Sequence, residues 1–387
     1  MFRLTSSIRG LFVLLSLCAG TLLAIIPKAP EMSAKAYILM DYDTGQILVA
    51  KNANLQMPPS SLTKMMTSYV MSDEVSKGNI SYQDMVPISK NAWAKNFPGS
   101  SLMFIEVGTE VRLEDLKRGV IISSGNDASV AVAEHIAGSE DGFAELMNHH
   151  AKRLGMLDTY FENSNGLPTE NHMTTAQDMA LLAQALIRDF PDDYEVYKEK
   201  EFTYNGIRQY NRNSLLWDRS MNVDGVKTGH TEVGGYSLVA SGTRDNMRLI
   251  SVVLGTNSKN ARKQQNKRLL NYGFRFYETV EPVRPGQVLH KLRIWYGEKE
   301  QIALGLEQTI LLTIPRGEGK KLKANFSIDG ELEAPIKKGQ LIGKVYFELN
   351  GDVVKEMPLV ALEDMPESGM WSQFTDYVAR KVDGWVN

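Results

Sequence analysis

The chain has 387 residues and a formal net charge of −3 at pH 7, and 43% of its residues are hydrophobic. This length suits two or three domains with sizeable cores, and the near-neutral charge excludes the overall basic field that nucleic-acid binding requires. The single cysteine, Cys18, lies inside an N-terminal apolar run, so the rest of the chain has no disulfide, thiolate metal site or cysteine nucleophile.

Residues 1–33 read as a signal peptide followed by a short N-terminal segment. Arg3 and Arg9 precede an apolar run from Leu11 to Ile26, and this order is typical of an export signal. An uncleaved membrane anchor is the alternative, but the run is short for a full span. We therefore expect export and cleavage, although the sequence shows no clear cleavage site.

Residues 34–280 carry patterns of both strands and helices. Two strand-like runs flank a turn at Asp43-Thr44-Gly45, and strands over 235–240 and 247–255 are joined by a second turn. Apolar residues at helical spacing predict helices over 61–76, 126–138, 140–154, 175–188 and 261–277. This distribution predicts an α+β domain, in which helices cover the faces of an antiparallel sheet.

Residues 281–364 have an all-β texture. Short apolar runs alternate with turns such as Asp329-Gly330 and Asn350-Gly351, and this pattern suits a small β-sandwich domain. We place the boundary at Glu281-Pro282, where proline and glycine cluster.

Residues 365–387 predict an amphipathic helix after a break at Met365-Pro366. Its apolar stripe consists of Trp371, Phe374, Val378, Val382 and Trp385. One interpretation is a helix that packs on its own β-domain. We favour docking on a membrane surface, because the helix is terminal and rich in interfacial aromatic residues.

The first candidate motif is Ser61-Leu62-Thr63-Lys64. A serine and a lysine at positions i and i+3 share one helix face, and the positive end of the helix favours an anion developing at Ser61. A serine hydroxyl becomes nucleophilic when a neighbouring base takes its proton. Lys64 fills that role only if its amine is neutral, which burial and nearby cations promote.

The second candidate motif is Ser124-Gly125-Asn126, at the start of an alanine-rich helix. The Ser124 hydroxyl is suited to relay a proton to a leaving amine, and the Asn126 amide to bind a substrate carbonyl. Ser89-Lys90-Asn91 and Ser258-Lys259-Asn260 match the same pattern, but they lie in polar contexts. Taken alone, Ser124 is equally typical of a helix-capping region.

The third candidate motif is Lys227-Thr228-Gly229, followed by His230. On an edge strand, a cation and a hydroxyl are suited to hold a carboxylate, and Gly229 lets another chain approach closely. The alternative is a solvated turn before a strand.

The ordered set of three motifs resembles that of penicillin-binding proteins and class A β-lactamases. Two longer stretches, Asn211-Arg212-Asn213 and residues 223–231, extend the similarity to the low-molecular-mass D-alanyl-D-alanine carboxypeptidases of the penicillin-binding protein 5/6 type. The resemblance runs from Ala34 to the C-terminus. It implies a β-lactamase/transpeptidase-like catalytic domain over 34–280, acting on peptidoglycan pentapeptides and acylated by β-lactams.

The resemblance also implies roles for individual residues. Ser61 would be the acylated nucleophile, Lys64 the general base and Ser124 the proton relay. The substrate-binding residues would be Asn126, Arg212, Lys227, Thr228, Gly229, His230 and Arg262. Arg262 is the best match to the arginine that binds the substrate's terminal carboxylate, with Arg212 and Lys263 as alternatives. No metal or cofactor is implied, and the implied location is the periplasmic face of the inner membrane.

Three alternatives remain at this stage. A β-lactamase shares all three motifs, but neither Glu162 nor Glu170 has the asparagine four residues later that class A enzymes carry. A DD-endopeptidase that cuts cross-links would use the same machinery. A catalytically silent wall-binding protein would not need the two lysines.

Overall fold

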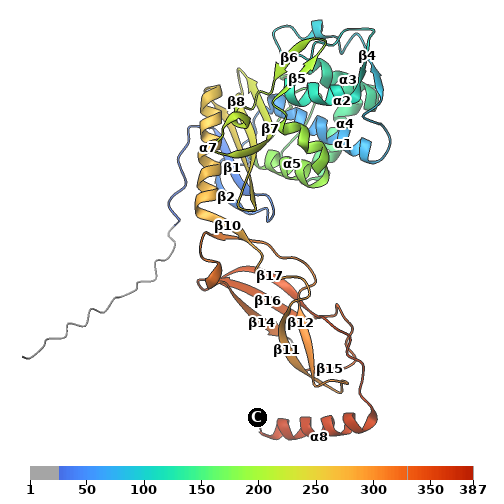
Figure 1. Cartoon of the computed structure of the whole chain (residues 1–387), viewed down its shortest axis with the longest axis vertical. Helices are drawn as coiled ribbons and strands as arrows, with labels where there is room; N and C mark the ends of the chain where they lie inside the picture. The colour runs from blue at the N-terminus through green and yellow to red at the C-terminus, as the bar shows by residue number, and fades with distance from the viewer. Residues whose placement is uncertain (1–25, 329, 387) are drawn as a thin grey trace, which may run out of the picture.

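The computed structural model describes residues 26–328 and 330–386, and the side chains up to residue 380. Nearly all of the predicted export signal therefore lies outside the described residues. The molecule is elongated, with an α+β body at one end, an all-β body next to it and a helix at the far end (Figure 1). The predicted α+β domain, the all-β domain after it and the C-terminal helix are all present in this order.

The α+β body is built on a five-stranded antiparallel sheet with the order β2-β1-β9-β8-β7. The strands are β1 (Ala36–Asp41), β2 (Ile47–Lys51), β7 (Asn222–Thr231), β8 (Gly235–Arg244) and β9 (Met247–Thr256). The first and last parts of this body thus pair in one sheet, and β7 forms an edge.

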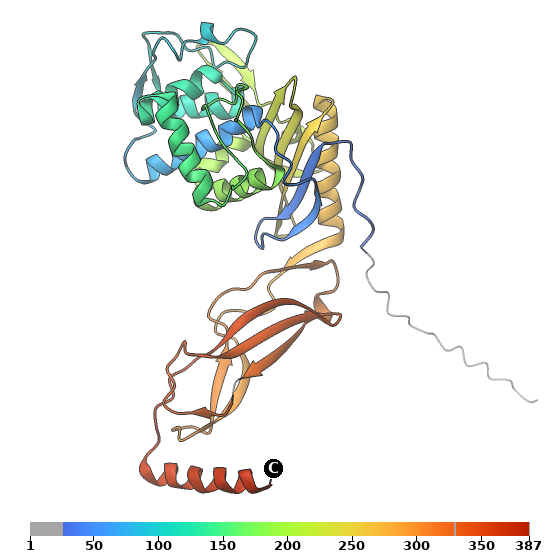
Figure 2. The same cartoon turned by 180° about the vertical axis from the view of Figure 1, so that it is seen from behind.

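The two faces of the sheet bury two different cores. Along β1, Ile38 and Met40 join the core under the helices, whereas Tyr37 and Leu39 join the core under α7 (Lys259–Phe276). Successive side chains of a strand point to opposite faces, so alternate residues feed alternate cores. Figures 1 and 2 show α7 on one side of the sheet and the helical cluster on the other.

The helical cluster lies between β2 and β7 in the chain. Its longer helices are α1 (Lys64–Ser76), α3 (Asn126–Ala137), α4 (Glu140–Arg153) and α5 (Ala176–Asp189), and its shorter helices are α2 (Leu113–Arg118) and α6 (Pro191–Tyr194). It also holds two antiparallel strand pairs, β3 (Met85–Pro87) with β4 (Glu110–Arg112) and β5 (Glu201–Tyr204) with β6 (Ile207–Tyr210). The sequence analysis missed α2, α6 and both strand pairs, because these elements are too short to show a clear period.

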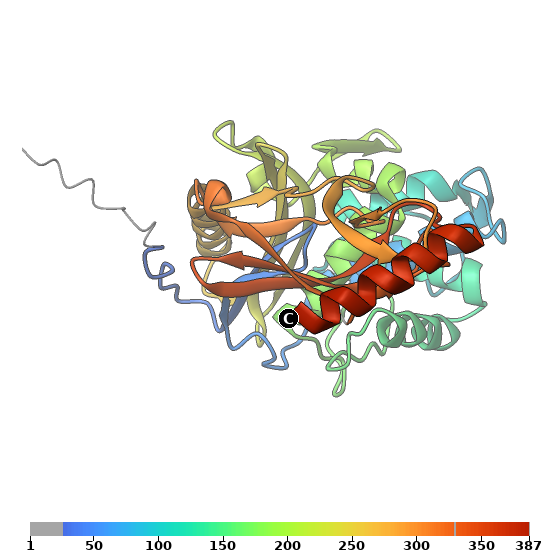
Figure 3. The same ribbon diagram turned by 90° about the horizontal axis from the view of Figure 1, so that it is seen from below.

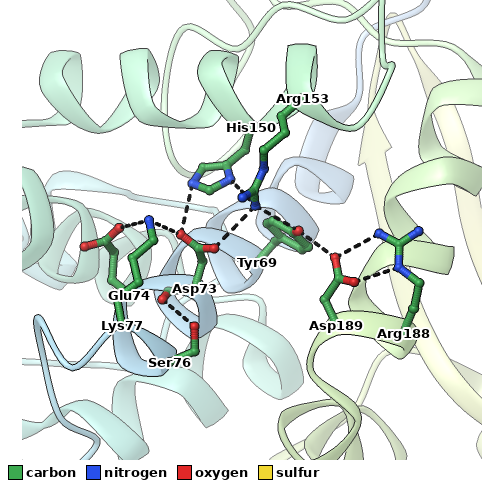
Figure 4. A network of polar contacts seen from close by, with 9 residues as sticks. All are labelled: Tyr69, Asp73, Glu74, Ser76, Lys77, His150, Arg153, Arg188 and Asp189. Atoms are coloured by element: carbon green, nitrogen blue, oxygen red, sulfur yellow. Dashed lines mark hydrogen bonds and ion pairs between the residues drawn. The ribbon is translucent and has the colours of Figure 1, made fainter.

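A polar network fixes the middle and the C-terminal end of α1 against α4 and α5 (Figure 4). Tyr69 Oη donates to Asp189 Oδ2 at 2.7 Å, and Arg153 lies 3.3 Å from Asp73 Oδ1. His150 is buried beside Asp73 and accepts a hydrogen bond from Arg153 at Nδ1. These contacts hold rigid the helix whose first residue is Lys64.

The all-β body contains a six-stranded sheet with the order β14-β16-β17-β12-β11-β15. Its strands are β11 (Val288–Trp295), β12 (Gln301–Gly305), β14 (Lys323–Ile328), β15 (Leu332–Glu333), β16 (Leu341–Leu349) and β17 (Asp352–Ala361), and β10 (Tyr277–Val280) pairs with β13 (Leu312–Pro315) beside it. The predicted all-β fold of this region is confirmed.

Side chains from both bodies meet at their junction. The hydroxyls of Thr44 and Thr313 lie 2.6 Å apart, and Thr279 Oγ1 donates to Asp41 Oδ2 at 2.6 Å. Asp41 also accepts hydrogen bonds from Thr44. The turn after β1 therefore anchors the all-β body.

The terminal helix α8 (Met370–Val386) lies across the end of the all-β body that is remote from the five-stranded sheet (Figures 1 and 3). Tyr296 N–H donates to Asp376 Oδ2 at 2.8 Å, and Arg380 forms ion pairs with Glu331 and Glu333. The polar face of the helix thus contacts the all-β body. Of the predicted apolar stripe, Val382 and Trp385 lie beyond the described side chains.

Candidate active site

Ser61 lies in a tight turn that leads directly into α1. The sequence analysis expected the helix to begin at Ser61, whereas residues Ser60–Thr63 form the 3₁₀ turn η1 and α1 begins at Lys64. Ser60 adopts a left-handed backbone conformation with φ of 55° at the start of this turn. The turn brings Ser61 Oγ within 3.5 Å of Lys64 Nζ.

Lys64 is completely buried, with no carboxylate in direct contact. Its Nζ donates to Asn126 Oδ1 at 2.7 Å and to the carbonyl oxygen of Asn165 at 2.5 Å. The pKa of Lys64 is lowered to about 7, chiefly by burial and also by the charge of Arg212, while Asp127 and Glu140 oppose the shift. A large fraction of this amine is therefore neutral near pH 7, as a general base requires.

Ser124 ends the π-helical turn η3 (Gly119–Ser123), just before α3. Its φ of 61° aims the hydroxyl across the site, where it accepts a hydrogen bond of 2.8 Å from Lys227 Nζ. Lys227 is also buried, and burial together with the charge of Lys64 lowers its pKa well below the usual value. Ser124 thus sits in a loop that enters a helix, as expected.

The Lys-Thr-Gly motif lies on β7, the edge strand of the sheet. A side chain at Gly229 would place its Cβ 3.0 Å from the carbonyl oxygen of Pro59, so glycine is what allows β7 to approach the serine turn. His230 follows on the strand and stacks on Tyr236, with ring centroids 3.9 Å apart.

Arg262 and Arg212 reach the site from different elements. Arg262 comes from the first turns of α7, and its Nη1 donates to the carbonyl oxygens of Gly229 at 2.8 Å and Ser237 at 3.4 Å. Arg212 comes from the segment between β6 and η5 (Ser214–Trp217) and stays exposed. Two arginines from separate parts of the chain therefore line the same cavity.

These elements enclose a cavity of 650 Å³. Eight of the ten predicted site residues line it, namely Ser61, Ser124, Asn126, Arg212, Thr228, Gly229, His230 and Arg262. The other two, Lys64 and Lys227, are buried and reach Ser61 and Ser124 from behind. The structure thus brings all ten together, although their positions in the chain span two hundred residues.

The sequence analysis missed several residues of this site. The segment Asn165-Gly166-Leu167-Pro168 lines the cavity, and so do Ser100 and Lys259. Gly166 has φ of 83°, and a Cβ there would lie 1.9 Å from the carbonyl oxygen of Ser60. The only signal in the sequence was this Asn-Gly pair, which indicates a turn but not its place in the fold.

The acidic residues considered for β-lactamase chemistry do not reach the cavity. Glu162 bonds to Asn171, and neither Glu162 nor Glu170 is among the lining residues. In the described part of the chain, no acidic residue lines the cavity and no cluster of potential ligands is suited to a metal ion.

Two family models match the chain: "D-alanyl-D-alanine carboxypeptidase" over residues 24–258, and "Penicillin-binding protein 5, C-terminal domain" over residues 277–367. The chain is 46% identical to D-alanyl-D-alanine carboxypeptidase DacA of Escherichia coli (strain K12) over 365 residues, which cover 93% of this chain and 91% of that protein. It is 45% identical to the structure of penicillin-binding protein 5 from Haemophilus influenzae, with a TM-score of 0.83 over 88% of this chain and 100% of that chain. It is 27% identical to penicillin-binding protein D2 from Listeria monocytogenes in the cefotaxime-bound form, with a TM-score of 0.59 over 64% of this chain and 100% of that chain.

Proposed function

The chain belongs to the D-alanyl-D-alanine carboxypeptidase family, and from this premise we propose how its own residues carry the reaction. The protein is a serine-type carboxypeptidase that removes the terminal D-alanine from peptidoglycan pentapeptides. The observation that carries the residue assignment is the 3.5 Å approach of a buried lysine amine to Ser61 Oγ at the wall of the cavity.

Acylation begins with the neutral Lys64 amine, which takes the proton of the Ser61 hydroxyl as Oγ attacks the carbonyl carbon of the penultimate D-alanine. The new bond between Oγ and carbon turns the carbonyl oxygen into an oxyanion. Backbone N–H groups, one of them from Ser61, stabilise that charge.

Collapse of this intermediate breaks the peptide C–N bond, and the leaving nitrogen must gain a proton. Ser124 is the proposed relay, because its hydroxyl opens onto the cavity and is bonded to Lys227. D-Alanine then leaves, and water attacks the ester on Ser61 to release the shortened peptide and the free serine.

Substrate recognition is proposed for the cationic and polar lining of the cavity. Arg262, supported by Thr228 and Gly229, would bind the terminal carboxylate, and Arg212 would add a second positive charge. Asn126 Nδ2, which donates to Ser100 Oγ at 3.0 Å, would turn to a substrate carbonyl. These donors together favour a peptide with a free C-terminal carboxylate.

The β-lactamase alternative is not supported by the lining of the cavity. Class A β-lactamases use a glutamate to activate the water that deacylates them, and no acidic residue of the described chain lines this cavity. β-Lactams are therefore expected to acylate Ser61 and to be released slowly.

The experiment that tests this function is incubation of the purified protein with a muropeptide pentapeptide, followed by mass spectrometry. The expected product has lost one D-alanine. Cleavage of a cross-linked dimer with no action on the monomer would instead support the endopeptidase alternative.

We also propose that the protein is exported and docks on the periplasmic face of the inner membrane through α8. The helix contacts the all-β body through Asp376 and Arg380, while Trp371 and Phe374 are 84% and 60% exposed. An exposed apolar face on a helix held by its polar face suits insertion into a lipid interface. In the described part of the chain, no helix is both long and apolar enough to traverse a bilayer.

Deletion of residues 370–387 tests this location. When lipid vesicles are sedimented, the truncated protein is expected to remain in the supernatant and to keep its activity on a soluble peptide. Unchanged retention on vesicles would refute the docking proposal without affecting the assignment of the reaction.

A further inference from the structure

Glu140, the first residue of α4, binds the segment that forms one wall of the site. Its Oε1 accepts hydrogen bonds from Ser164 Oγ at 2.6 Å, from Ser164 N–H at 3.3 Å and from Asn165 Nδ2 at 3.4 Å. Ser164 and Asn165 are buried, whereas Glu140 is half-buried. One carboxylate oxygen thus holds two consecutive residues.

The held segment supplies the acceptor for the proposed base. The carbonyl oxygen of Asn165 receives Lys64 Nζ, and Thr67 Oγ1 of α1 donates to the carbonyl oxygen of Ser164 at 2.5 Å. The segment is therefore held by α1 on one side and by α4 on the other. Apart from Lys64 itself, the residues that make these contacts, Thr67 and Glu140, lie outside the three sequence motifs.

The orientation of a neutral amine depends on its acceptors. A neutral lysine amine has two N–H donors and one lone pair. In this site, Asn126 Oδ1 and the Asn165 carbonyl occupy the two donors, so the lone pair is left for the Ser61 hydroxyl. Without the Asn165 carbonyl in place, one N–H would be free to turn toward Ser61. The lone pair would then point away from the Ser61 hydroxyl.

We propose that Glu140 is a positioning residue for the general base: it fixes Ser164-Asn165 so that the Asn165 carbonyl orients the Lys64 amine toward Ser61. This inference rests on the proposed function of Lys64 and deepens it. The Glu140 carboxylate also raises the pKa of Lys64, in the same direction as Asp127 and against the effects of burial and Arg212.

Substitutions at positions 140, 141 and 164 separate these effects. Glu140→Ala removes both the acceptor and the charge, and Glu140→Gln keeps an acceptor oxygen but removes the charge. Ser164→Ala removes the shortest of the three hydrogen bonds. Asp141→Asn is the matched control, because Asp141 is the neighbouring acid on the first turn of α4 and is exposed.

The readout is the second-order rate constant of acylation by a fluorescent penicillin, measured against pH and expressed per titrated active site. A misplaced catalytic group costs about 10²-fold in rate, so we expect Glu140→Ala to lose about that factor even at pH 9. The rate constant of Glu140→Gln is expected to stay within about threefold of that of the unmodified protein at pH 9. In its pH profile, the fall in rate on the acid side should move to lower pH, because the charge that raises the pKa of Lys64 is gone. Asp141→Asn is expected to match the unmodified protein.

The double variant gives a second measurement. If Glu140 acts through Ser164, the double variant Glu140→Ala/Ser164→Ala is expected to be no slower than Glu140→Ala alone. Ser164→Ala alone should slow acylation, which keeps the proposal testable if Glu140→Ala does not fold. Normal acylation in Ser164→Ala and Glu140→Ala, or equal losses in Glu140→Ala and Asp141→Asn, would overturn the proposal.

A different experiment, labelling of Ser61→Ala by the same penicillin, tests the proposed function. Persistent labelling of Ser61→Ala would remove the nucleophile assignment itself. If Ser61→Ala is not labelled and Glu140→Ala is acylated at the normal rate, only the positioning role of Glu140 is refuted.

Discussion

Lys227 Nζ donates a hydrogen bond of 2.8 Å to Ser124 Oγ, and this contact joins the edge strand β7 to the turn before α3. The contact joins the sheet to the helical cluster at the wall of the cavity. Because the charge of Lys64 contributes to the lowered pKa of Lys227, the two amines do not titrate independently. Protonation of one amine thus affects both sides of the site.

Ser61→Ala is expected to abolish covalent labelling by a fluorescent penicillin, because Ser61 is the proposed attacking group. Gel fluorescence after denaturation measures the label. Ser60→Ala is the control, since Ser60 precedes Ser61 but does not line the cavity, and it should still be labelled. Label retained on the Ser61 variant would move the nucleophile elsewhere.

The acylation rate is expected to depend on the neutral form of Lys64. Because the pKa of Lys64 is about 7, log(kcat/KM) should fall with unit slope below pH 7, which is tenfold per pH unit, and level off above it. Lys64→Arg should lose at least about 10²-fold, since a guanidinium stays protonated. A profile that stays flat from pH 8 to pH 5 would exclude Lys64 as the base.

Arg262→Ala is expected to raise KM for D-Ala-D-Ala peptides by about tenfold or more, which corresponds to the loss of one charge-assisted hydrogen bond. Penicillin acylation should slow less. The next residue on α7 provides the control, because Lys263 does not line the cavity, and Lys263→Ala should leave KM unchanged. Equal effects on peptide and penicillin would remove Arg262 as the reader of the carboxylate.

The buried His172 is expected to make the fold less stable in acid. Its Nδ1 accepts from Glu162 N–H at 3.1 Å, its Nε2 bonds to Thr63 Oγ1 at 2.8 Å, and burial lowers its pKa to about 4. Below pH 6.5 the unfolded chain binds a proton that the folded protein does not, so the free energy of unfolding falls as pH drops from about 6.5 to 4, by about 2 kcal/mol between pH 7 and pH 5.

Urea unfolding at pH 7 and pH 5 measures this contribution, with His172→Gln as the comparison. The variant should lose less stability than the unmodified protein between the two pH values, because glutamine does not titrate. The same pH dependence in both proteins would show that His172 is not the group responsible.

The sequence predicted those parts of the site that depend on short spacing. Ser61 and Lys64 are three residues apart, and a turn of helical backbone brings two such side chains together whatever surrounds them. Ser124 at a helix entry and Lys227-Thr228-Gly229 on a strand were likewise indicated by local pattern. The helix start at Ser61 was wrong by three residues, because a 3₁₀ turn intervenes.

Other parts of the site had no local signal. The Asn165 carbonyl belongs to the backbone. Because every residue carries a backbone carbonyl, the type of residue at this position does not mark its role. Glu140 is a common residue at a helix start, and only the fold places its carboxylate on Ser164. A contact between segments that lie far apart in the chain is not visible in the pattern of either segment.

The sequence by itself determined which reactive groups the protein carries and the order in which it carries them, since motifs, strand alternation and helical period depend on near neighbours. Only the tertiary structure decided the state of these groups. The Lys64 amine is partly neutral at pH 7 because the folded chain buries it completely, and desolvation depends on everything packed around an atom.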